Sequence, residues 1–109
     1  MFTSNMNKGF SMTFTNGNTI SVQWGVANYC EHYMSEMDHK LSQAWDVWKS
    51  KDTEMAAWDE QGNWHNFERG CGIGGKQVQG YISADDVLAF MNFVATNKLV
   101  TGEDNEQED

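Results

Sequence analysis

The chain has 109 residues, no proline and a formal net charge of −9, from 7 basic and 16 acidic side chains. This length predicts one domain, and no apolar run reaches the roughly 18 residues that a membrane-spanning helix needs. The first residues, MFTSNMNKGF, lack the basic and apolar regions of a secretory signal. The composition thus argues against a membrane protein, a secreted disulfide scaffold and a basic nucleic-acid-binding protein, and it predicts a cytoplasmic location.

Residues 10–24 alternate apolar with polar side chains, which is typical of two half-buried strands. A two-residue Asn16-Gly17 loop would place the two apolar rows on opposite faces of the hairpin. A three-residue loop over 15–17 pairs Met12 with Ile20 instead, and it puts glycine at the left-handed position of a bulged turn. We therefore expect the three-residue loop.

Residues 25–52 give mixed signals. Met34, Met37 and Leu41 follow helical spacing, whereas the segment Trp45-Asp46-Val47-Trp48 alternates like a strand. We expect irregular structure here with one or two helical turns.

Residues 53–67 repeat the hairpin pattern around a loop over 60–62. This loop pairs Trp58 with Trp64 and Met55 with Phe67, so both faces of the hairpin carry large side chains. One face can join the core. The other needs a second cover, either the central segment or a partner subunit.

A strand over 77–82 and a helix over 84–97 complete the pattern. Ser83 can cap the helix, with Asp86 three residues later. Its predicted apolar face consists of Ala84, Val87, Leu88, Phe90, Met91, Val94 and Ala95. Phe93 falls beside this face, which leaves it either at the edge of the core or as an exposed contact.

These elements predict an α+β fold: a mainly antiparallel sheet of two β-hairpins plus a further strand, with the C-terminal amphipathic helix packed on one face. The globular domain is expected to span 1–102. Residues 103–109 hold five acidic and no apolar side chains, which predicts a disordered tail and leaves the rest of the chain at a formal charge of −4.

Two motifs point to cofactors but lack the necessary context. Residues 70–75, GCGIGG, match a dinucleotide-binding pattern, but the following residues indicate a strand rather than the helix that binds the pyrophosphate. Cys30, His32 and His65 lack the spacing of a zinc site. We therefore predict no catalytic, cofactor-binding or metal-binding residue. A small-ligand or metal-dependent enzyme centred on Cys30, His32 and His65 stays as an alternative.

Three segments resemble a group of uncharacterised small proteins of marine tailed bacteriophages. They are GFSMTFTNGNTISVQWGVANYC over 9–30, EMAAWDEQGNW over 54–64 and VQGYISADDVLAFMNFV over 78–94, about half of the chain. The resemblance implies synthesis in an infected bacterial cytoplasm. It carries no functional residues over, because the group has no assigned activity.

The surplus of aromatic side chains, 13% of the residues, gives the leading functional hypothesis. Aromatic platforms for nucleic acid come with basic grooves, and 7 scattered basic residues do not form one. We expect a non-enzymatic binding protein, a phage accessory factor that engages a host protein. Its candidate surface comprises Trp58, Trp64 and Phe93. A self-associating structural protein is the alternative.

Overall fold

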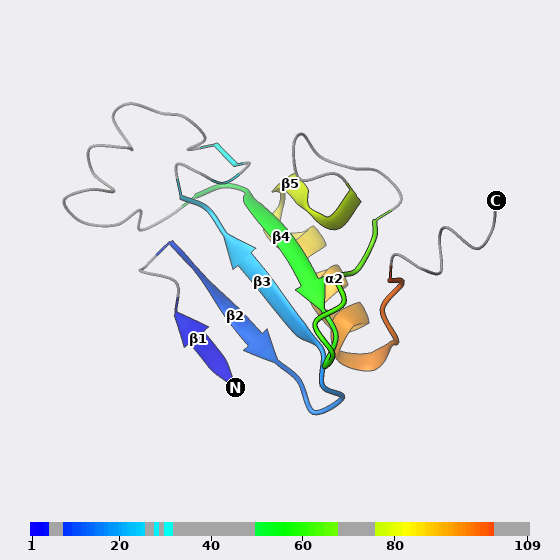
Figure 1. Cartoon of the computed structure of the whole chain (residues 1–109). Coiled ribbons are helices and arrows are strands. Elements are labelled where there is room, and N and C mark those ends of the chain that lie inside the picture. Colours follow the sequence, from blue (N-terminus) through cyan, green and yellow to red (C-terminus); the bar gives the residue numbers. More distant parts are fainter. Residues whose placement is uncertain (5–7, 26–27, 29, 32–49, 68–75, 102–109) are drawn as a thin grey trace.

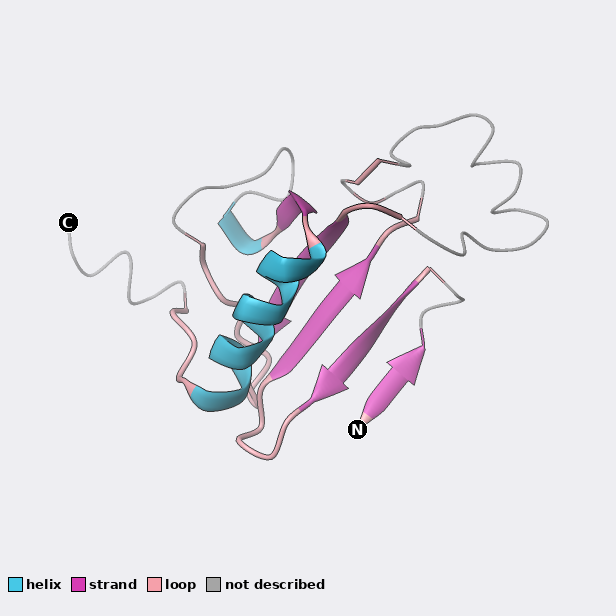
Figure 2. Ribbon diagram, turned by 180° about the vertical axis from the view of Figure 1, so that it is seen from behind, coloured by secondary structure: helices cyan, strands magenta, loops and turns pink. Residues whose placement is uncertain are grey.

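The computed structural model describes residues 1–4, 8–25, 28, 30–31, 50–67 and 76–101. Within them, five strands form one antiparallel sheet in the order β1-β2-β3-β4-β5, and helix α2 crosses one face (Figures 1 and 2). The elements are β1 (Phe2–Ser4), β2 (Gly9–Thr13), β3 (Thr19–Gln23), β4 (Thr53–Trp58), β5 (Gln79–Ile82) and α2 (Ala84–Thr96). The predicted α+β fold is confirmed.

The first hairpin has the predicted three-residue loop. Met12 pairs with Ile20, and the Phe14 N–H donates to the Asn18 carbonyl at 2.9 Å. Gly17 has a φ of +93°, so it occupies the left-handed position that favours glycine. The apolar rows of β2 and β3 therefore share one face of the sheet, as their spacing required.

Strand β1 was not among the expected elements. Its three residues pair antiparallel with β2, with Phe2 opposite Met12. The segment is too short for an alternation pattern to be visible in the sequence. It forms one edge of the sheet, where Phe2 is 78% exposed.

The second hairpin keeps its predicted turn but not its predicted second strand. The Asp59 N–H donates to the Asn63 carbonyl at 2.9 Å, and Trp58 pairs with Trp64. The expected pairing of Met55 with Phe67 is wrong, since Met55 lies opposite Gln79 of β5. The chain turns away from β4 after this short pairing, and β5 takes the place beside it.

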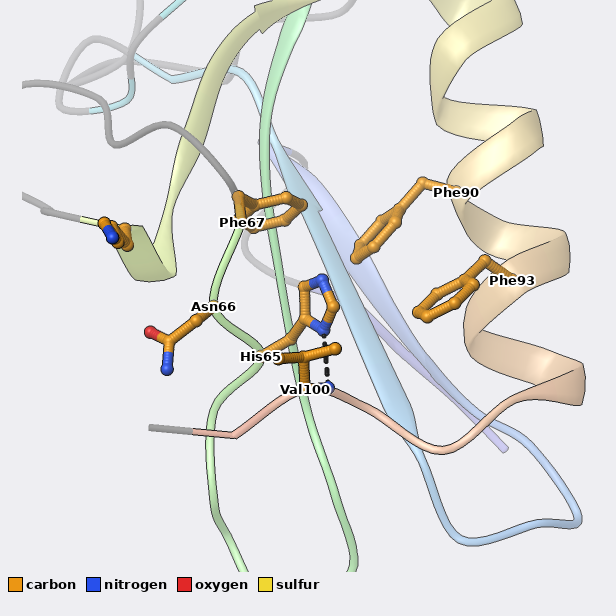
Figure 3. A pocket seen from close by; sticks show the side chains of 7 residues that line it. His65, Asn66, Phe67, Phe90, Phe93 and Val100 are labelled. Carbon is orange, nitrogen blue, oxygen red and sulfur yellow. Dashed lines mark hydrogen bonds between the residues drawn. The ribbon is translucent and has the colours of Figure 1, made fainter. Parts of the chain in front are cut away.

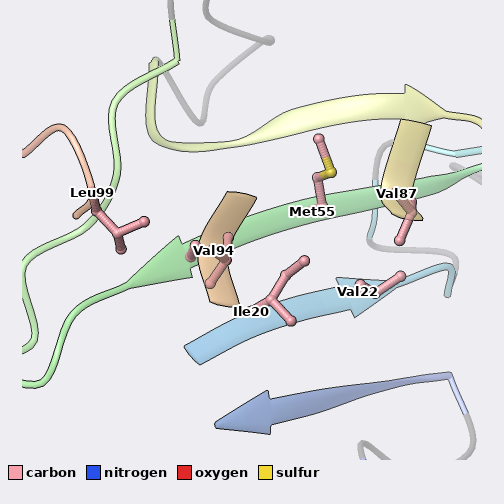
Figure 4. Close-up of a cluster of buried hydrophobic side chains, with 7 residues drawn as sticks. Ile20, Val22, Met55, Val87, Val94 and Leu99 are labelled. Carbon is pink, nitrogen blue, oxygen red and sulfur yellow. The ribbon is translucent and has the colours of Figure 1, made fainter. Parts of the chain in front are cut away.

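The core lies between α2 and the neighbouring strands β3 and β4 (Figure 4). Because side chains alternate along a strand, one face of the sheet gathers the apolar residues and meets the helix there. The buried cluster consists of Ile20, Val22, Met55, Ala57, Val87, Val94 and Leu99.

Helix α2 begins as predicted but buries a narrower face. The Asp86 N–H donates to Ser83 Oγ at 3.2 Å, which confirms the N-cap. Leu88 is 58% exposed and Ala84 is also exposed, so these two members of the expected apolar face were assigned wrongly. Phe93 is half-buried and packs against the core, at its edge. The helix packs mainly against β3 and β4. The residues of its predicted apolar face that lie beyond these two strands are therefore exposed.

The end of α2 is held by the turn of the first hairpin. Asn18 Nδ2 donates to the carbonyls of Val94, at 3.0 Å, and Asn97, at 2.8 Å. Asn16 Nδ2 adds a third hydrogen bond, to the Val94 carbonyl at 2.9 Å. Carbonyls at a helix C-terminus have no partner within the helix, so these two amides serve as its cap. The contact places the turn of the first hairpin beside the helix end.

Candidate functional site

Trp58 and Trp64 form an aromatic pair, here called the tryptophan pair. Their paired positions across the second turn bring the ring centroids to 5.2 Å with an interplanar angle of 30°. Trp64 is 39% exposed and Trp58 is half-buried. Since the neighbouring Ala57 belongs to the core, Trp58 lies on the sheet face opposite the helix. The first two residues of the expected surface thus lie together.

Phe93, the third residue of that surface, lies elsewhere. It is on α2, and its ring contacts are with His65, at a centroid distance of 5.5 Å, and Phe90, at 6.0 Å. Helix α2 covers the core face of the sheet, whereas the tryptophans lie on the other face. The structure therefore does not group Phe93 with the tryptophan pair.

A polar cavity of about 390 Å³ adjoins the second turn, and we call it the turn cavity. It is lined by both hairpin turns and the end of α2, through Asn16, Asn18, Asp59, Glu60, Gln61, Thr96, Asn97, Lys98 and Leu99. Two carboxylates face one ammonium group in this lining. The last turn of α2 carries no basic residue, and the amides that cap its carbonyls, from Asn16 and Asn18, are neutral. The turn cavity is thus suited to a cationic group.

Asp59 links the turn cavity to the tryptophan pair. It follows Trp58 directly, and its Oδ1 accepts hydrogen bonds from the N–H groups of Gln61, at 3.0 Å, and Asn63, at 2.9 Å. This carboxylate shapes the turn that sets Trp64 against Trp58. The exposed carboxylate of Glu60 is not bound in this way.

A second cavity, of about 490 Å³, lies on the helix side of the same segment (Figure 3). We call it the aromatic pocket. Its lining consists of His65, Asn66, Phe67, Lys76, Phe90, Phe93 and Val100. The His65 ring lies 4.9 Å from Phe67 and 5.4 Å from Phe90, between centroids. Residue 64 points outward, and residue 65 points toward the helix, because successive side chains of an extended segment alternate.

His65 is held in one tautomer. Its side chain is 7% exposed, and its Nδ1 accepts the Val100 N–H at 3.1 Å. Burial lowers the pKa of His65 below its ordinary value of 6.5, so the ring is neutral at pH 7. The proton therefore resides on Nε2, which lies on the Phe67 and Phe90 side of the ring (Figure 3). Among the described residues, no side chain or backbone group accepts a hydrogen bond from it.

The alternative centre of Cys30, His32 and His65 is not assembled by the described residues. Cys30 is buried, and its Sγ lies 3.6 Å from the Gly25 carbonyl, just beyond the end of β3. The His65 N–H donates to Ala57, near the opposite end of β4. His32 lies outside the described residues. Within the described part, no three His, Cys, Asp or Glu side chains form a group able to hold a metal ion.

Several other expectations also fall outside the described residues: the glycine-rich segment 70–75, most of 25–52 and the tail 103–109. The aromatic pocket was missed at the sequence level. One signal for it was available, because Phe90 and Phe93 are three residues apart on the helix. Nothing in the sequence placed His65 or Lys76 beside them.

No protein-family model, curated protein or solved structure matches this chain. In the described residues, none of the helices is long and apolar enough to cross a membrane.

Proposed function

We propose that this chain is a non-enzymatic binding protein that engages another protein through the tryptophan pair. The observation that carries the proposal is the exposure of Trp64, at 39%, on top of a second tryptophan. Tryptophan is enriched at binding hot spots because a rigid aromatic ring buries a large area at little entropic cost. The paired rings form a preorganised platform of this kind.

The charges beside the platform indicate the chemistry of the partner. The turn cavity holds the carboxylates of Asp59 and Glu60 against one lysine, next to the carbonyl end of α2. A partner surface that presents an arginine or lysine beside an apolar patch would match both features. The cationic group would enter the turn cavity and the apolar patch would cover Trp64.

The resemblance to bacteriophage proteins supplies the biological setting of the proposal. A phage accessory factor made in an infected bacterium would meet host proteins in the cytoplasm. The net charge of −9 would favour encounter with a basic host surface.

Affinity capture from a bacterial host lysate tests the proposal. We expect the wild-type chain to retain a protein that Trp64→Ser loses, with affinity lowered about thirtyfold or more, since a hot-spot residue contributes about 2 kcal/mol. Leu88→Ser is the matched control, because Leu88 is equally apolar and 58% exposed but lies on the helix. The Leu88→Ser control should retain the partner. Binding of the partner to the wild-type chain should weaken as the salt concentration is raised. Equal capture by Trp64→Ser would contradict the proposal.

Self-association is the second candidate, and the exposed edge strand β1 favours it. Met1 and Phe2 are 84% and 78% exposed, and such an edge can pair with another copy of the chain. Sedimentation equilibrium distinguishes the two functions. A mass that stays monomeric as concentration rises excludes self-association, whereas a dimer disrupted by Phe2→Lys but not by Trp64→Ser supports it.

A further inference from the structure

We propose that the aromatic pocket binds a small planar aromatic carboxylate. This inference goes beyond the binding of a protein partner, because it concerns the opposite side of the 63–67 segment and different residues.

The size and walls of the pocket suit one aromatic ring. Its volume of about 490 Å³ lies within the range of small-molecule sites, roughly 300–1,000 Å³. Phe90 and Phe93 stack with a centroid distance of 6.0 Å and an interplanar angle of 15°, and Phe67 lies 5.0 Å from Phe90. Three phenylalanine rings from two segments thus offer both faces and edges to a planar guest.

His65 supplies a hydrogen-bond donor that has no partner among the described residues. The Val100 N–H occupies Nδ1 and so leaves the proton on Nε2, on the side of Phe67 and Phe90 (Figure 3). A donor of fixed direction at the wall of a pocket can bond an acceptor on a ligand that enters it. A carboxylate oxygen is such an acceptor.

The charge of the lining selects an anion. Among the described residues that line the pocket, Lys76 carries the one charged side chain, and no carboxylate accompanies it. Aromatic rings alone would also attract a cationic ligand over their faces. The ammonium group of Lys76 would repel such a ligand, because the two carry like charges. Asn66 adds a neutral amide, and its position is set by its backbone N–H, which donates to the Val100 carbonyl at 2.7 Å. The lining therefore favours an acid over an amide, and an amide over an amine.

Three probes of nearly the same shape test this order: phenylacetate, phenylacetamide and phenethylamine. Titration of the full chain, followed by NMR signals of His65 and Val100, should give saturable binding of phenylacetate. We expect it to bind about tenfold more tightly than phenylacetamide, as for one charge-assisted hydrogen bond. Phenethylamine should bind most weakly. No saturable binding of phenylacetate, equal affinities, or tightest binding of the amine would each overturn the proposal.

Substitutions locate the binding and its charge preference. Lys76→Gln should weaken phenylacetate binding about tenfold and leave phenylacetamide unchanged, because it removes only the charge. Lys98→Gln, in the turn cavity, is the matched control and should change neither affinity. Val100→Phe places a larger side chain at a partly exposed wall and should abolish binding of phenylacetate. Loss of the acid preference in Lys98→Gln but not in Lys76→Gln would contradict the assignment. Capture of a protein partner through Trp64 should not respond to Lys76→Gln, so either proposal can fail alone.

Discussion

At the scale of single residues, two side chains sit in environments that should alter stability in measurable ways. His65 is a titratable ring enclosed by aromatic side chains, and Tyr81 is a bulky residue in a backbone conformation that such residues rarely adopt. In both cases the tertiary structure imposes a local cost.

The buried ring of His65 should make the protein less stable in mild acid. Its pKa is lowered by burial in the folded chain, whereas it is ordinary, near 6.5, in the unfolded chain. Below pH 6.5 the unfolded chain therefore takes up a proton that the folded chain does not, and the stability is lost as pH falls from there toward the folded pKa. Above pH 6.5 the His65 ring is neutral in both the folded and the unfolded chain, so the full stability is present.

Urea unfolding at about pH 7.5 and about pH 5.5 measures the effect. In His65→Phe, which keeps a ring but cannot titrate, the decrease in unfolding free energy between the two pH values should be smaller than in the wild type. The same decrease in both proteins would show that the pH dependence arises from other groups. An NMR titration of His65 should give a midpoint below 6.5.

At position 81, glycine should give a more stable protein than alanine. At an ordinary strand position glycine is less stable than alanine. Its φ is +56°, at the register shift between β4 and β5, and its side chain is 55% exposed. Left-handed backbone costs a non-glycine residue roughly 1–2 kcal/mol. Tyr81→Gly should therefore be about 1 kcal/mol more stable than Tyr81→Ala, as measured by urea unfolding. An alanine variant that equals or exceeds the glycine variant would contradict this conformation.

At the scale of elements, the main finding is that a hairpin turn caps a helix from a distance. Asn18 is 6% exposed and donates to two carbonyls at the end of α2, 76 and 79 residues away. The same asparagine closes the hairpin, since its carbonyl accepts the Phe14 N–H. One residue thus joins the sheet to the helix.

Asn18→Asp should destabilise the fold by about 2–4 kcal/mol. The change removes two buried donors and places a carboxylate against the negative end of the helix. Asn63→Asp, in the other hairpin turn, is the matched control, because its side chain is exposed and its turn contact is made by the backbone. It should shift the unfolding free energy by about 0.5 kcal/mol or less. Similar midpoints in urea for both variants would contradict the capping role.

At the scale of the whole molecule, the sheet has unlike faces and the two cavities have unlike charge. The helix covers the face that carries Ile20 and Met55, and the tryptophan pair lies on the other face. Counting the described lining residues, the turn cavity has two carboxylates and one ammonium group, whereas the aromatic pocket has one ammonium group and no carboxylate. Both cavities adjoin residues 59–67, so this one segment contributes to both of the sites that we propose, one for a cationic group of a partner and one for an anionic ligand.

The sequence by itself determined the elements whose signals are local. The pairing of Met12 with Ile20, the turn at Gly62 and the cap at Ser83 follow from side-chain periodicity and turn chemistry within a few residues. The pairing of Trp64 with Trp58 also follows from that turn. These features need no knowledge of the rest of the chain.

Only the tertiary structure decided which distant segments meet. Strand β5, rather than residues 63–67, lies beside β4, and this frees Phe67 and His65 to pack against Phe90 on the helix. Phe93 joined that cluster instead of the tryptophans. The physical reason is that neighbours in a sheet, and the pockets between a sheet and a helix, are chosen by the burial summed over the whole chain. The side-chain period, two residues in a strand and 3.6 in a helix, shows which side chains share one face of that element. It does not show which other element that face will contact.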